Sequence, residues 1–283
     1  MERVCLESVY LSSDDSHFEL FLKYLKGEEV VVLDNYYFRT DYQKAIKAKG
    51  CTLVCIDDMH DQPFVADLII NHAPGITPND YEAQPHTRFA LGLNYALLRP
   101  LFLEQIQKDR TISKLDTILV CFGGSDPTHL TEKALKTVST LKQFNRILVI
   151  TGAAYQLTTE LSTLIERDAR IDYRHSLNEH QMLEAMLEAD LAIVPSSSIL
   201  LELMTVGVGV LTGYYVENQR EASNHFGQLQ LACNMGDLRV NFEEKLLAQL
   251  QKMTLSEMKK MVQNQKSLLK NSKNAFIQLF KSL

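Results

Sequence analysis

The residues whose types best fit ligand chemistry are Gly123, Gly124, Ser125 and Asp126, which follow the apolar run 117–120 and precede a helical pattern. Glycines let backbone N–H groups approach an anion closely, and a helix N-terminus adds a partial positive charge. This spacing therefore predicts a phosphate-binding turn. An ordinary tight turn between a strand and a helix is the alternative that these residues leave open.

A second polar turn follows the apolar run 189–194, where Ser197 and Ser198 open another helical pattern. Glu202 lies one turn into this helix, among leucines. A carboxylate at that place can accept hydrogen bonds from both hydroxyl groups of a ribose. The alternative is a glutamate near a helix start that only interacts favourably with the helix dipole.

A third polar turn carries Asn218 and Gln219 after the short apolar run 208–211. The carboxyl ends of parallel strands meet at one edge of a sheet, and ligands of α/β proteins bind in the crevice outside that edge. Three successive turns with polar, anion-friendly residues therefore predict one ligand crevice.

The elements that must position these turns alternate between strand and helix, which predicts parallel sheets with helices on both faces. Strands are expected at 30–33, 52–56, 67–71, 88–91, 117–121, 146–150, 171–174, 190–194 and 208–211. Helices are expected at 15–26, 41–49, 131–142, 156–167, 178–188, 199–206, 219–229 and in the segment 244–283. We predict an α/β protein of two Rossmann-like domains, residues 1–108 and 109–283, linked through 99–115.

The three polar turns, taken in order, resemble the nucleotide-binding half of the GT-B superfamily, near the lipid-II N-acetylglucosaminyltransferases. A narrower likeness is to the UDP-2,4-diacetamido-2,4,6-trideoxy-β-L-altropyranose hydrolases of pseudaminic acid biosynthesis, or spore-coat polysaccharide G-type proteins. Four segments of the N-terminal half fit that family in the same order, namely 32–37, 55–58, 66–71 and 92–100. The likeness covers most of residues 4–235.

This resemblance implies a GT-B-like fold and an enzyme that hydrolyses a UDP-linked diacetamido-trideoxy sugar to UDP and a free amino sugar. It places nucleotide binding at Gly123, Gly124, Ser125, Asp126, Ser197, Ser198, Glu202, Asn218 and Gln219. It places sugar binding at Asn35, Tyr36, Asn71 and Tyr95. Tyr36 and Asn218 match positions of the family's cleft and are candidates to orient water or sugar. No metal and no cofactor is expected.

One family feature is missing from the sequence. Members begin with a strand, a Gly-x-Gly-His loop and a helix, and that histidine is their proposed catalytic base. Here the first strand candidate, 4–6, leads into the polar segment 12–16, and His17 has no glycine loop before it. We therefore expect a shortened N-terminal domain that lacks roughly its first two βα units. An inactive hydrolase, a glycosyltransferase with a UDP-sugar donor and a non-catalytic UDP-sugar-binding protein remain alternatives.

Composition and charge narrow the classes of partner. A net charge of −6 argues against a nucleic acid, and no apolar run reaches the length of a membrane span. The N-terminus lacks the basic start and apolar core of a signal peptide. The five cysteines are an odd number, and Cys51 and Cys55 would lie about 13 Å apart along one strand, too far for a disulfide. Reduced thiols and a cytoplasmic location are expected.

Two further expectations concern the N-terminal half. The run 30–33 has no polar alternation, which is typical of a strand covered on both faces, so a shortened domain would expose an apolar edge. We expect a homo-oligomer that makes contact through residues 4–33. His60, His72 and His86 lack metal-ligand spacing and are expected to be loop residues, while Asp57 with its neighbour Asp58 is expected to cap a loop.

Overall fold

The computed structural model describes residues 8–12, 14 and 16–283 and divides them into two compact units. Unit 1 takes the described part of Met1–His72 together with Ile76–Gly92 and Leu279–Leu283, and unit 2 takes Ala73–Gly75 and Leu93–Gln278. The strand candidate at 4–6 lies outside the described residues. Within the part of the chain that is described, no helix is long and apolar enough to cross a membrane.

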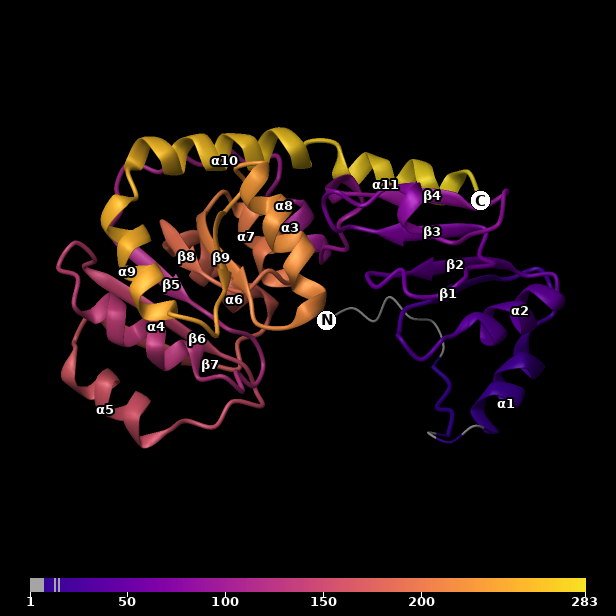
Figure 1. The fold of residues 1–283 in the computed structure, drawn as a ribbon, viewed down its shortest axis with the longest axis horizontal. Coiled ribbons are helices and arrows are strands. Elements are labelled where there is room, and N and C mark those ends of the chain that lie inside the picture. The colour runs from indigo at the N-terminus through magenta and orange to yellow at the C-terminus, as the bar shows by residue number, and fades with distance from the viewer. Residues whose placement is uncertain (1–7, 13, 15) are drawn as a thin grey trace. The chain divides into compact units, whose positions relative to one another are not determined.

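Unit 1 contains a parallel sheet of β1 (Val30–Leu33), β2 (Thr52–Ile56), β3 (Leu68–Asn71) and β4 (Arg88–Leu91), in that spatial order. The helices α1 (Ser16–Tyr24) and α2 (Thr40–Ala48) precede β1 and β2, and the short helix η1 (Pro78–Asp80) precedes β4. Figure 1 shows this sheet in violet. Its core contains the fully buried residues Ile46, Leu53 and Ile69.

Unit 2 contains a six-stranded parallel sheet in the order β10-β9-β8-β5-β6-β7 (Figure 1). The strands are β5 (Thr117–Val120), β6 (Arg146–Thr151), β7 (Ile171–His175), β8 (Leu191–Ile193), β9 (Gly209–Tyr214) and β10 (Cys233–Asp237). The helices are α3 (Pro100–Leu103), α4 (Leu130–Ser139), α5 (Thr159–Arg167), α6 (Glu179–Glu188), α7 (Ser198–Val206), α8 (Arg220–Gln228), α9 (Phe242–Lys252) and α10 (Leu255–Leu269). Two short 3-10 helices, η2 (Leu93–Tyr95) and η3 (Glu217–Gln219), precede α3 and α8. The last helix of the chain is α11 (Ser272–Lys281).

Two apolar clusters cover the two faces of this second sheet. Successive side chains of a strand point to opposite faces. Accordingly, Leu119 of β5 lies in one cluster, whereas its neighbours Ile118 and Val120 lie in the other. A sheet buried on both faces needs nearly continuous apolar strands, which is why these runs were visible in the sequence. The fold is an α/β fold with two Rossmann-like units, as predicted.

The predicted strands and helices are present to within a few residues, but two features differ from the expectation. The edge strand β10 was not predicted, because its sequence Cys-Asn-Met-Gly-Asp has no apolar run. The segment expected to link the domains instead contributes to unit 2, whose long span runs from Leu93 to Gln278, whereas the predicted boundary was at 109. The reason is α3, whose Phe102 is fully buried in the core of unit 2.

The strand β1 lies at the edge of the unit 1 sheet and is covered on one face only. Val31 and Leu33 are buried, whereas Val30 and Val32 are 48% and 45% exposed. The run 30–33 was expected to be covered on both faces by its composition. Within the described residues its second face stays open to solvent, so the expected apolar edge is present.

Candidate nucleotide site

The site lies where the strand order of unit 2 reverses. From β5 the chain continues to β6 and β7 on one side, and then returns to β8 on the other side of β5, followed by β9 and β10. The registers pair Val120 of β5 with both Val149 of β6 and Ile193 of β8. The loops after β5 and β8 therefore leave the same edge in opposite directions, and this topological switch point is where the predicted ligand crevice would lie.

A cluster of glycines forms the first wall of this crevice. Gly123 has a φ of +85°, which favours glycine, and a Cβ atom on Gly123 or Gly124 would meet nothing within 4 Å. Gly152, after β6, approaches so closely that a Cβ there would lie 2.6 Å from the Cα of Gly124. We call Gly123, Gly124 and Gly152 the glycine cradle. Its open space in front of bare backbone is suited to an anion.

Gly152 is a residue that the sequence interpretation missed. Its backbone N–H donates to the carbonyl of Gly123 at 3.2 Å, so the two loops are joined. The signal was present, because Gly152 follows an apolar strand directly, just as the first glycine turn does.

Asp126 has a structural partner inside the protein. Its carboxylate oxygens accept hydrogen bonds from the backbone N–H groups of Leu130 and Thr131 at 2.9 and 2.7 Å. These are among the free donors at the start of α4, so the carboxylate caps the helix. Asp126 was predicted to bind the nucleotide. In this arrangement both of its carboxylate oxygens are hydrogen-bonded to the start of α4.

Buried hydroxyl groups lie near the start of α4. Among the described residues, the hydroxyls of Thr128, Thr131 and Tyr155 are buried without a hydrogen-bond partner. Burial raises the pKa of Tyr155, and the charges of Glu132 and Asp126 add to this effect. The phenol therefore remains protonated at neutral pH and can donate a hydrogen bond.

The second turn places Ser197 at the start of α7 with extended backbone geometry. Ser197 is half-buried and Ser198 is exposed, so the first turn of α7 is accessible to a ligand. The preceding Ser196 is buried and its hydroxyl lies 3.0 Å from that of Thr212. The predicted pair of serines thus lies at the crevice, and Ser196 joins the ends of β8 and β9.

Glu202 forms an ion pair that the sequence interpretation did not predict. The Nε and Nη2 atoms of Arg99 each donate to one carboxylate oxygen of Glu202 at 2.8 Å. The Glu202 side chain is only 12% exposed. Because α7 begins at Ser198, Glu202 lies beyond its first turn, and the helix-dipole explanation does not apply. The pair joins residues far apart in sequence, so no local signal indicated Arg99.

The third turn is the short helix η3. Asn218 is exposed, and the Oε1 atom of Gln219 accepts a hydrogen bond from the backbone N–H of Tyr215 at 3.4 Å. Arg220 pairs with Glu217 at 2.9 Å. The turn therefore follows the end of β9 at the same sheet edge, with Asn218 open to solvent.

The predicted sugar residues are divided between the units. Tyr95 belongs to unit 2, whereas Asn35, Tyr36 and Asn71 belong to unit 1. Asn71 is buried and donates to the Tyr81 hydroxyl at 2.8 Å, which is a structural contact. Tyr36 is 60% exposed and donates to Asp58 at 3.0 Å.

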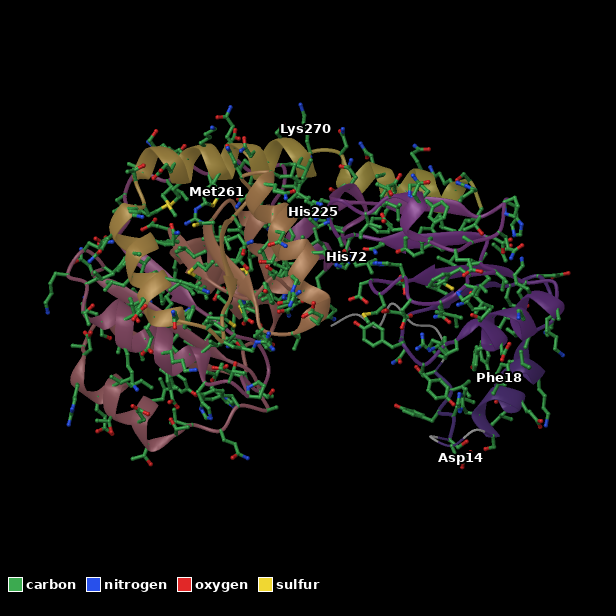
Figure 2. The ribbon with its side chains drawn as sticks, in the orientation of Figure 1. Asp14, Phe18, His72, His225, Met261 and Lys270 are labelled. Atoms are coloured by element: carbon green, nitrogen blue, oxygen red, sulfur yellow. The ribbon has the colours of Figure 1, made fainter. Side chains whose placement is uncertain are left out.

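Unit 1 also contains a pocket of about 370 Å³ between α1, α2 and the carboxyl end of β1. Aromatic residues dominate its lining, among them His17, Tyr37, Phe38 and Tyr42, with Asn35 at its polar side. Phe18, labelled in Figure 2, stacks on Tyr42 at 4.2 Å beside this pocket. His17 therefore packs among aromatic side chains.

The loop histidines of unit 1 have different surroundings. The Asp57 carboxylate accepts a hydrogen bond from the His60 backbone N–H at 2.8 Å, which confirms the predicted loop cap. His86 lies 3.7 Å from Asp67. His72, labelled in Figure 2, follows β3, and burial lowers the pKa of its imidazole. In the described part of the chain, no group of three or more His, Cys, Asp or Glu residues could hold a metal ion.

Solved structures identify the class of fold. Acinetobacter baumannii MurG is similar over 95% of this chain and 78% of its own length, with a TM-score of 0.66 and 15% identity. A putative UDP-N-acetylglucosamine 2-epimerase from Listeria monocytogenes is similar over 98% and 82%, with a TM-score of 0.61 and 11% identity. The protein has a GT-B-like fold with two parallel-sheet Rossmann-like units.

Curated proteins include relatives in sequence at 25–29% identity, whereas no family model matches the chain. Uncharacterized protein MJ1062 of Methanocaldococcus jannaschii is 27% identical over 76% of this chain and 46% of its own length. Spore coat polysaccharide biosynthesis protein SpsG of Bacillus subtilis is 29% identical over 68% and 56%. The chain thus spans about half the length of these two. The UDP-2,4-diacetamido-2,4,6-trideoxy-beta-L-altropyranose hydrolase of Campylobacter jejuni is 25% identical over 76% and 77%.

Proposed function

We propose that this chain binds a UDP-sugar at the carboxyl edge of the unit 2 sheet and processes it in the biosynthesis of a surface polysaccharide. The observation that carries this proposal is the glycine cradle at the switch point between β5 and β8. Bare backbone at such a point suits a diphosphate, which needs several N–H donors at close range. The name of the Campylobacter relative supports the same substrate class, and the name of the Bacillus relative supports a role in polysaccharide biosynthesis.

The diphosphate and the ribose of the nucleotide each have a proposed counterpart in the crevice. The cradle would receive the diphosphate, together with the first turn of α7 at Ser197 and Ser198. The Glu202 carboxylate would accept hydrogen bonds from the ribose hydroxyls. Ser125, Asn218 and Gln219 remain predicted contacts at the rim of the same edge.

We propose hydrolysis as the reaction. Water would attack the anomeric carbon of the sugar, the bond from that carbon to the phosphate oxygen would break, and UDP would leave. Such a step gains from a group that removes a proton from water. The predicted candidates are Tyr36 and Asn218, and neither side chain is a base at neutral pH. The diacetamido-trideoxy sugar is the substrate we propose, on the name of the Campylobacter relative.

The second candidate function is binding of a UDP-sugar without hydrolysis. It is favoured by the absence of a Gly-x-Gly-His segment from the 283-residue sequence. A glycosyltransferase would differ from the hydrolase only in the acceptor that attacks the sugar. Incubating the protein with the UDP-linked sugar and following UDP release distinguishes turnover from binding. Release of UDP would support hydrolysis, and binding without release would support the second candidate.

Calorimetry with UDP tests the nucleotide site. Gly124→Ala should weaken UDP binding about tenfold or more, because the added methyl group occupies open space that a phosphate needs, without a clash in the free protein. Glu202→Gln should weaken it similarly. Glu166→Gln, an exposed change on α5, is the control. Failure of the wild type to bind millimolar UDP, or equal binding by all variants, would overturn the assignment.

A further inference from the structure

We propose that Arg99 is a positioning residue of the nucleotide site, which holds the Glu202 carboxylate in the orientation by which the site prefers a ribose over a deoxyribose. This inference rests on the proposed function and deepens it. Nothing in the resemblance or in the names of the relatives gives Arg99 a role.

The geometry leaves room for a ribose on the ion pair. A carboxylate has about four lone-pair positions on its two oxygens. The side-on contact by Nε and Nη2 uses one position on each oxygen of Glu202, at 2.8 Å in both cases. One position on each oxygen therefore stays available, which matches the two O–H donors of a 2′,3′-diol.

Arg99 is held by contacts other than Glu202. Its guanidinium lies 4.7 Å from the ring centroid of Phe102, a fully buried residue. The carbonyl of Arg99 accepts hydrogen bonds from the backbone N–H groups of Phe102 and Leu103 at 2.9 and 3.2 Å, so the residue begins α3. The helix α3 packs against α7, which carries Glu202. The position of the Arg99 guanidinium beside Glu202 is therefore fixed by the packing of these two helices.

The surroundings of Glu202 require such a partner. Its neighbours Leu201 and Leu203 are buried, and a carboxylate in apolar surroundings needs a charged or hydrogen-bonding partner. The guanidinium of Arg99 is such a partner. Burial raises the pKa of Cys121 to about 11, with the charges of Asp126 and Glu202 adding to it. Glu202 therefore interacts electrostatically with the end of β5, where the glycine cradle begins.

The test compares the binding of UDP and 2′-deoxy-UDP by calorimetry in the wild type, Arg99→Gln and Arg99→Lys. The control Arg146→Gln removes another ion-paired arginine of unit 2, which is 43% exposed against 41% for Arg99 and lies at the amino end of β6. The wild type should prefer UDP by about tenfold. Arg99→Gln should bring the ratio close to one, Arg99→Lys should keep part of it, and the control should keep all of it.

The outcomes distinguish this inference from the proposed function. If the wild type does not bind UDP, the nucleotide site itself is wrong. If the wild type prefers UDP and Arg99→Gln keeps the full preference, only the positioning role is wrong. Tighter UDP binding by Arg99→Gln would show that the arginine competes with the ribose, which also overturns the inference. If Arg99→Gln does not fold, an unchanged ratio in Arg99→Lys decides against it.

Discussion

At the scale of single residues, the burial of His72 links the protonation of its imidazole to the stability of the folded protein. Burial lowers the pKa of this histidine, and the negative charges of Asp58 and Asp34 oppose the change only in part. The strand registers explain why these groups meet, because Ile56 pairs with Ile70 and the residues that follow leave the same edge. His72 is therefore disfavoured as a cation in the folded state.

This leads to a prediction about pH. The unfolded chain binds a proton at His72 more readily than the folded chain does, so stability should fall as the pH decreases below about 6.5. His72→Gln removes this contribution, and its free energy of unfolding should depend less on pH than that of the wild type. Urea unfolding at pH 8 and pH 5.5 measures the difference. His180→Gln, an exposed change on α6, should retain the wild-type dependence; equal slopes in all three proteins would contradict the expectation.

At the scale of elements, the N-terminus of α4 could either bind an anion or be capped by a side chain of the protein. A free helix N-terminus would attract an anion, but the Asp126 carboxylate already satisfies two of its N–H groups. The glycine cradle supplies the open backbone instead. The helix is thus stabilised from within, and we propose that the loop after β5 offers its backbone donors to the ligand.

Asp126→Ala should therefore act mainly on stability. Loss of both hydrogen bonds to a charged cap should lower the free energy of unfolding by about 1–3 kcal/mol. Asp126→Ser keeps one side-chain acceptor and should cost less. Chemical denaturation of the two variants measures the effect. Wild-type stability in Asp126→Ala, combined with a large loss of UDP affinity, would instead support direct nucleotide binding by this carboxylate.

At the scale of the whole molecule, the edge strand β1 remains exposed on one face. An edge strand with exposed apolar side chains is a template for association with another chain. We propose a homo-oligomer that makes contact through this part of unit 1, where Val30 and Val32 are exposed.

Val32→Glu should dissociate such an oligomer, since it places a charge in the apolar contact. Light scattering at micromolar concentration should give at least twice the chain mass for the wild type and the single-chain mass for the variant. Val240→Glu, at a residue of unit 2 that is 53% exposed, is the control and should associate as the wild type does. A monomeric wild type would mean that β1 needs no partner.

The sequence by itself determined most strands, most helices and the order of the polar turns, because each depends on local apolar runs and turn residues. It also indicated the glycine turn and the acidic residue on α7. Only the tertiary structure decided which groups meet. Arg99 and Glu202 are 103 residues apart, and the contact of Gly152 with Gly124 joins two different loops. The burial of Asn71 and the capping by Asp126 likewise depend on packing. Such contacts are set by strand order and burial, which leave no periodic signal in the sequence.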